Sequence, residues 1–159
     1  LDNNNNLRNA MHHSKIKPTW VTPHPTNDYV YIAGNGSDEI LKVDLNKWEI
    51  ADRVKTGKGP YNLEVSPDGK YLLASIKGEG KTGVWMLNNL TFVKNINNSG
   101  SVSHGVTISP DSKFAFVSLE GVGGDPGIVD VISLKSLKVV SSVKVGKQAG
   151  GIAFWKIED

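Results

Sequence analysis

The chain has 159 residues, with 18 Lys and Arg against 16 Asp and Glu, 17 Gly and no Cys. This length is enough for a domain with a sizeable core, and the lack of cysteine excludes disulfides, thiolate zinc sites, cysteine nucleophiles and cysteine-held iron–sulfur clusters. The near balance of charge offers no basic surface, so we expect no nucleic-acid partner.

The start of the chain carries little targeting information. No apolar stretch approaches the ~20 residues of a membrane-spanning helix, so no membrane span is expected. No signal peptide is recognisable, and the sequence begins with Leu1 instead of Met. These features predict a processed, trimmed or partial product.

The sequence repeats itself at an interval of 42 or 43 residues. A first recurring segment ends in proline, and a second begins with leucine. The copies are Pro18–Pro25, Pro60–Pro67 and Ser103–Pro110, followed in each repeat by Leu45–Ile50, Leu87–Phe92 and Leu134–Val139. The second step between the leucine segments is longer because of extra residues in the glycine-rich tip 120–127, where insertion costs little.

In chain order, the repeats predict a leader, three similar units and a final fragment. The leader is 1–17, and its segment Leu7–Met11 aligns with the outermost strand of an incomplete unit. The units are 18–59, 60–102 and 103–148, and the final fragment, 149–159, is expected to be an innermost closing strand. The innermost strands of the four copies are expected near 19–23, 61–66, 104–109 and 150–155.

Each unit is expected to contain four short strands. In the second unit these are 62–66, 71–76, 83–87 and 91–96, after the pattern of apolar runs and turn residues. The turn Pro67–Lys70 contains Gly69, for which we expect a positive φ. No segment has helical periodicity over three turns.

Units of about 40 residues with four strands are typical of β-propeller blades. The predicted fold class is therefore all-β, a β-propeller with three four-stranded blades plus a closing strand. A β-sandwich does not explain self-similarity at this period. Because propellers need 4–8 blades, three blades cannot close a ring. We expect the remaining blades of the propeller, or a second copy of the chain, to complete it, and the isolated chain not to be a stable closed monomer.

The repeat resembles the YVTN-type β-propeller repeat of secreted, surface-layer and periplasmic bacterial and archaeal proteins. The matching segments are Gly57 with Pro60, Val65-Ser66-Pro67-Asp68-Gly69-Lys70, Tyr71-Leu72-Leu73-Ala74 and Val43-Asp44-Leu45. The tetrapeptide that names the family occurs only in altered form, as in Tyr31-Ile32-Ala33-Gly34. The resemblance implies that the chain is the C-terminal part of a ring of about seven blades, located in the periplasm or outside the cell.

The candidate site residues lie where the mouth of the central channel is expected. His104 and Tyr61 occupy equivalent positions just before an innermost strand, and Trp20 lies beside the equivalent position of the first unit. We predict that His104, Tyr61 and Trp20 bind a ligand there. In the same alignment, the four inner-strand residues Val21, Leu63, Val106 and Ile152 are expected to be buried between blades of a closed ring.

An alternative interpretation is a metal- or haem-associated redox domain. His12 and His13 align with the end of an outer strand that enters the same face as His104. Imidazoles from separate blades are ligands for copper, iron or haem. The segment Ser103–Gly105, followed by Ser-Pro-Asp, is similar to propeller domains of copper-dependent nitrous-oxide reductases. In the structural alternative, His12 and His13 belong to a polar leader and His104 to a solvated loop.

Three further functional motifs are rejected because the surrounding sequence does not fit them. Gly78–Thr82 is similar to the end of a phosphate-binding loop, but a strand follows it instead of a helix. Glu120–Gly127 has too few ligands for a calcium loop. No strained Gly-x-Ser-x-Gly turn is present, and no catalytic residue is predicted. The leading hypothesis is a non-catalytic binding scaffold without cofactor that presents its channel mouth and rim loops to a protein, glycan or small ligand.

Overall fold

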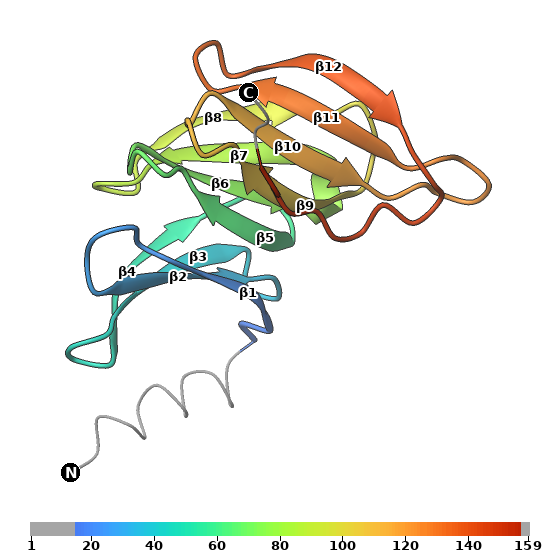
Figure 1. Ribbon diagram of the computed structural model, residues 1–159. Coiled ribbons are helices and arrows are strands. Elements are labelled where there is room, and N and C mark those ends of the chain that lie inside the picture. The colour runs from blue at the N-terminus through green and yellow to red at the C-terminus, as the bar shows by residue number, and fades with distance from the viewer. Residues whose placement is uncertain (1–14, 157–159) are drawn as a thin grey trace.

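The computed structural model describes residues 15–156, which form three four-stranded antiparallel sheets (Figure 1). The first sheet consists of β1 (Pro18–Pro23), β2 (Tyr29–Gly34), β3 (Glu39–Asp44) and β4 (Glu49–Lys55). The second consists of β5 (Pro60–Val65), β6 (Tyr71–Ile76), β7 (Lys81–Met86) and β8 (Phe92–Asn97). The third consists of β9 (Ser103–Ile108), β10 (Phe114–Leu119), β11 (Ile128–Ser133) and β12 (Lys138–Lys144). The predicted all-β fold class and its three four-stranded units are confirmed.

Each sheet is a meander in which strands adjacent in sequence are paired. The inner strand β5 lies beside the inner strands of both other sheets, β1 and β9. Figure 1 shows the first and third sheets on either side of the second, as an open arrangement that does not close into a ring. Among residues 15–156 the single helical segment is a 3-10 turn, Lys77–Glu79, and no helix there is long and apolar enough to cross a membrane.

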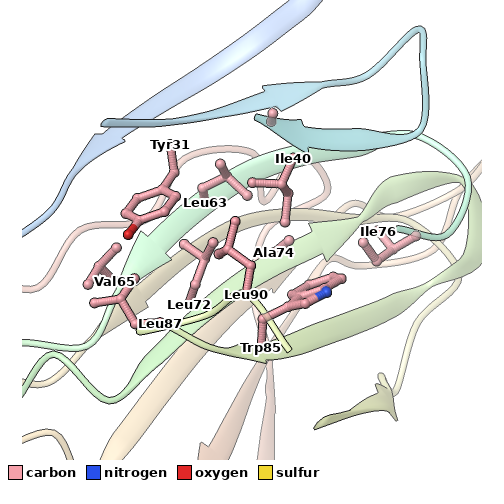
Figure 2. Packing of buried hydrophobic residues seen from close by; sticks show 11 residues of the cluster. Tyr31, Ile40, Leu63, Val65, Leu72, Ala74, Ile76, Trp85, Leu87 and Leu90 are labelled. Carbon is pink, nitrogen blue, oxygen red and sulfur yellow. The ribbon is translucent and has the colours of Figure 1, made fainter. Parts of the chain in front are cut away.

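The middle sheet is covered on both faces, which explains its near-continuous apolar strands. Successive residues of a strand point to opposite faces, so Leu72 packs toward the first sheet and Leu73 toward the third. Both side chains are fully buried. Figure 2 shows the first of these clusters, in which Tyr31 and Ile40 lie over Leu72 and its neighbours.

A third cluster lies on the far face of the first sheet. It consists of Ile16, Ile32, Leu41 and Val43. No sheet of the described chain covers this face, and Val21 on β1 is 57% exposed. Its repeat equivalents Leu63 and Val106 are buried, as expected, because a sheet packs against each of them.

The hairpins that join the two inner strands of the second and third sheets, Pro67–Lys70 and Pro110–Lys113, differ at one position. Gly69 has a φ of +69°, so the predicted left-handed turn residue is confirmed. Its equivalent in the third sheet, Ser112, has a φ of +55°. Left-handed backbone is unfavourable for a residue with a Cβ atom, but the Ser112 hydroxyl accepts a hydrogen bond from the Asp68 backbone amide at 3.0 Å. This contact links the two hairpins.

The expected innermost strands at 19–23, 61–66 and 104–109 correspond to β1, β5 and β9. The fourth, the closing strand predicted near 150–155 in the final fragment 149–159, is wrong, since residues 149–156 contain no strand. A strand requires ladder hydrogen bonds to a neighbour, and the described chain supplies no such neighbour there. Ile152 is accordingly only partly buried. The leader strand Leu7–Met11 and residues 157–159 lie outside the described residues.

Candidate functional site

His104 and Tyr61 lie side by side at the end of the molecule where inner strands begin. Tyr61 is the second residue of β5 and His104 the second residue of β9. Because the two strands are neighbours, these repeat-equivalent residues come into contact, with ring centroids 4.3 Å apart and ring planes at 49°. Their action on a ligand stays a prediction.

Two charged residues complete this arrangement. The Nζ atom of Lys77 lies 4.5 Å from the centroid of the Tyr61 ring and donates to Oε1 of Glu120 at 3.0 Å. Nε2 of His104 lies 3.1 Å from the same Glu120 oxygen, and this contact assigns a proton to Nε2. We call Tyr61, Lys77, His104 and Glu120 the aromatic–charged cluster.

The cluster is accessible without being fully exposed. The side chains of Lys77, His104 and Glu120 are 30%, 20% and 24% exposed. The cluster therefore presents donors, a carboxylate acceptor and aromatic surface at a partly dehydrated site, where cation–π and ion-pair contacts are stronger than in open water. These groups suit the recognition of a polar ligand. The described structure assigns none of them the role of an activated nucleophile.

Lys77 and Glu120 occupy the same loop position in their two sheets. Both residues directly follow the second strand of their sheet, and the equivalent residue of the first sheet is Asn35. Asn35 Nδ2 donates to the carbonyl oxygen of Pro60, at the start of the next inner strand, at 3.3 Å. Sequence reasoning considered Glu120 only as part of a calcium loop and missed its pairing with Lys77, although opposite charges one repeat apart are a usable signal for such a pair.

Trp20, the third predicted ligand residue, lies apart from this cluster. It is 46% exposed and lines a cavity of about 520 Å³ on the first sheet together with Thr19, Val21 and Ile32. Trp48, which follows β3, is 51% exposed, whereas its repeat equivalent Leu90 is buried. The open face of the first sheet thus carries apolar residues at positions that the second sheet buries.

The predicted metal site stays a prediction, because His12 and His13 lie outside residues 15–156. Within these residues, no group of three or more His, Asp or Glu side chains lies close enough to hold a metal ion. His24 has a structural role, because its Nδ1 accepts hydrogen bonds from the backbone amides of Thr26 and Asn27, both at 3.1 Å. Partial burial, and then the charge of Lys42, lower the pKa of His24.

The last described segment occupies a position that the repeat predicts. The Ser118 hydroxyl donates to the carbonyl oxygen of Gly150 at 2.7 Å. The equivalent hydroxyl of Ser75 donates to the carbonyl oxygen of His104, on β9. Gly150 is therefore held against the third sheet in the way that the start of β9 is held against the second.

Comparison with known proteins gives matches among solved structures only. A scan against protein families finds no match, and no curated protein matches the chain. Among solved structures, hydrazine synthase of Kuenenia stuttgartiensis has a TM-score of 0.78 at 23% identity, over 86% of this chain and 38% of that one. A structure of U3-55K has a TM-score of 0.74 at 12% identity, over 86% of this chain and 42% of that one.

A third similar structure contains the WD40 repeats of RRP9, with a TM-score of 0.74 at 13% identity, over 86% of this chain and 41% of that one. The chain thus spans about two fifths of the length of the solved structures that it resembles. At these identities the likeness concerns fold alone. Three consecutive meander sheets that match propeller proteins but do not close a ring make the described chain a partial β-propeller.

Proposed function

We propose that the chain is a non-catalytic binding scaffold, part of a larger β-propeller, that recognises its ligand at the aromatic–charged cluster. The observation that carries this proposal is the meeting of Tyr61, Lys77, His104 and Glu120 from two adjoining sheets at one end of the inner strands. Propeller scaffolds bind partners through loops at the ends of their strands, and the WD40 neighbours fit such a role. The ligand class is a protein segment, a glycan or a small polar molecule.

Further blades complete the ring in this proposal. Val21 is exposed although its equivalents are buried at both internal interfaces, and Trp48 is exposed although its equivalents are buried or partly buried there. This contrast supports an additional blade against the first sheet. The docking of Gly150 against Ser118 supports another blade that begins with this segment. Either the remaining blades of the propeller or a second copy of the chain supplies them. A YVTN-type repeat and a periplasmic or extracellular location belong to the same proposal, by the resemblance of the repeat.

Binding is tested with immobilised peptide and glycan panels, and the hits are then measured by titration calorimetry. We expect His104→Ala and Tyr61→Ala to weaken the binding of a hit about tenfold, which corresponds to 1.4 kcal/mol. Lys138→Ala, at an exposed position of β12 outside the cluster, is the control. Hits whose affinity is unchanged in both cluster variants would contradict the assignment of the site.

Ring completion is tested by size-exclusion chromatography with light scattering. The isolated chain should associate, because its open apolar face and its unpaired segment favour contact with another copy. A monodisperse, thermally stable monomer of 17.2 kDa would contradict this part of the proposal. The binding experiment does not depend on this result.

A second candidate function is a metal- or haem-associated redox domain in which His104 acts together with His12 and His13. The observation that favours it is the likeness to hydrazine synthase. Metal analysis and a visible spectrum of the purified protein distinguish the two proposals, because only the redox domain contains stoichiometric copper, iron or haem. A colourless, metal-free protein that binds a panel ligand through His104 would reject the redox function.

A further inference from the structure

A second cavity lies at the opposite end of the strands from the aromatic–charged cluster. It has a volume of about 420 Å³ and lies between the second and third sheets, beside the hairpin turns that follow β5 and β9. Three lysines line it, Lys70, Lys113 and Lys135, together with the aromatic residues Tyr71 and Phe114. This set is independent of the residues used in the proposed function.

The fold brings two of these lysines close together. Lys113 directly precedes β10, and Lys135 is the second residue after β11. The Leu134 backbone amide donates to the carbonyl oxygen of Lys113 at 2.9 Å, so the two segments are neighbours. Their repeat equivalents in the first sheet are Asp28 and Asn46, and Asn46 Nδ2 donates to Asp28 Oδ2 at 3.1 Å. Positions that form a hydrogen bond in the first sheet thus carry two positive charges in the third.

Two carboxylates offset part of this charge. Asp68 lines the cavity, and its Oδ1 accepts hydrogen bonds from the Ser66 hydroxyl at 2.6 Å and from the Lys70 backbone amide at 3.0 Å, which are neutral donors that leave its negative charge in place. Asp111 pairs with Lys113 at 3.2 Å, and because the side chain of Lys113 is 71% exposed, water screens this pair. Within residues 15–156, Lys70 and Lys135 have no ion pair. Three lysines against these two carboxylates leave the cavity with a net positive charge.

The cavity also offers apolar surface. Phe114 is 39% exposed although it begins a strand, while Leu134, which also lines the cavity, is buried. Phe114 thus adds apolar surface to a cavity that three lysines also line. A complementary ligand combines an apolar side chain, which covers Phe114, with carboxylates on either side.

We propose that this lysine-lined cavity binds an acidic peptide segment of a partner protein, with one apolar side chain against Phe114 and flanking carboxylates on Lys70, Lys113 and Lys135. We commit to a peptide because it combines an apolar side chain, which buries the exposed part of Phe114, with carboxylates that pair with the lysines. Charge complementarity of this kind gives the partner specificity and a faster association rate.

The test measures fluorescence anisotropy of a labelled peptide Asp-Glu-Phe-Asp-Glu with the 159-residue chain. We expect saturable binding that weakens as salt is raised. The double variant Lys113→Gln with Lys135→Gln should weaken binding about tenfold, which corresponds to 1.4 kcal/mol. The control replaces two exposed lysines at the other end of the molecule, Lys58→Gln with Lys147→Gln, and should leave affinity unchanged.

Other probes decide the ligand class. A peptide with Gly in place of Phe, and one with Asn and Gln in place of the acids, should each bind more weakly than the parent. Equal or tighter binding of an oligogalacturonate would overturn the assignment to a peptide. The proposal also fails if the acidic peptide does not bind, or if both lysine pairs affect its binding equally, because the attraction is then non-specific. Thermal melts of both double variants confirm that each is folded.

Discussion

The two interfaces between sheets have the same geometry but different chemistry. Between the first and second sheets the contact is mainly apolar, with Tyr31 and Ile40 packed on Leu63 and Leu72 (Figure 2). Between the second and third sheets an apolar cluster is joined by a buried network of hydrogen bonds around Asp130. Adjacent copies of the repeat are therefore held together by apolar packing at one interface and by apolar packing with a hydrogen-bond network at the other.

The polar network is well satisfied. Asp130 is fully buried and accepts hydrogen bonds from Asn98 Nδ2 at 3.2 Å, the Ser99 backbone amide at 2.8 Å and the Ser142 hydroxyl at 2.6 Å. Asn98 Oδ1 in turn accepts the hydroxyl hydrogen bond of Ser103 at 2.9 Å. A buried carboxylate without a cation persists only when such donors compensate its lost hydration.

A single hydroxyl illustrates the difference on a smaller scale. Ser75 links the second sheet to the carbonyl oxygen of His104, but its equivalent in the first sheet is Ala33, which has no hydroxyl. There the Thr19 hydroxyl donates to the carbonyl oxygen of Tyr61 instead, at 2.7 Å. The inner-strand carbonyl has a partner at both interfaces, although different strands supply it.

The largest effect is expected at the apolar interface. Trp85 is 1% exposed and packs edge-to-face on Phe92, with ring centroids 5.6 Å apart. Trp85→Ala should lower the free energy of unfolding by about 3–5 kcal/mol, because it leaves a large cavity. Urea unfolding measures this. Trp85→Phe should cost less, since the indole N–H has no hydrogen-bond partner among residues 15–156. Equal losses for both variants would show that the indole N–H matters.

Substitution of Asp130 at the polar interface should lower the free energy of unfolding slightly less. Asp130→Ala leaves the Asn98, Ser99 and Ser142 donors without their acceptor, so we expect a loss of about 3 kcal/mol in urea unfolding. Asp130→Asn keeps one acceptor oxygen and should cost less. If the Ala variant is as stable as the parent, the network does not hold the two sheets together.

Substitution of Ser75 or Ser118, the serines whose hydroxyls hold the next segment of chain, should cost less stability. Ser75→Ala leaves the Asn62 backbone amide and the His104 carbonyl oxygen without this hydroxyl, and should cost about 1.5 kcal/mol. Ser118→Ala removes the equivalent contacts but should cost less, because Gly150 lies in a more exposed segment. Thermal unfolding of the two variants, compared with the parent, ranks them. The reverse order would mean that the last segment is more tightly held than its exposure indicates.

The hairpin turns provide a finer comparison. Gly69→Ala places a Cβ atom on left-handed backbone and should cost about 1 kcal/mol. Ser112→Gly relieves the same strain in the third sheet but removes the hydrogen bond from the Asp68 amide, so these effects should nearly cancel. Melting temperatures are the readout. A clear stabilisation by Ser112→Gly would show that the hydrogen bond contributes little.

The smallest effect is expected on β5, the strand that both interfaces share. Burial raises the pKa of Glu64 in the folded protein, so the folded state favours the neutral acid, and stability falls as pH rises through that pKa. Glu64→Gln should therefore raise the melting temperature slightly near neutral pH and change little in acid.

Glu39 is the control for this pH effect, because its pKa is shifted in the opposite direction. The hydrogen bond from Lys55 lowers the pKa of Glu39, with the charges of Lys55 and Arg53 adding to it. Glu39 therefore stabilises the fold above its unfolded pKa, and this contribution is lost as pH falls through the folded pKa. Glu39→Gln should lower the melting temperature at neutral pH. The same shift for both variants would contradict the assigned directions.

The sequence by itself was sufficient to predict the repeat, the four-stranded units and the turn at Gly69. These features depend on local patterns, since apolar runs, turn residues and the repeat interval can all be read along one stretch of chain. The proximity of Tyr61 and His104 follows from the same register, because equivalent positions of adjoining inner strands lie side by side.

Only the tertiary structure decided which side chains meet between sheets. Lys77 reaches Glu120, and Asp130 is fully buried, because two sheets bring positions far apart in sequence into contact. The exposure of Val21 and the absence of a strand at 149–156 also depend on neighbours. An apolar residue is buried only where another sheet covers it, and a segment becomes a strand only where a partner completes its hydrogen-bond ladder.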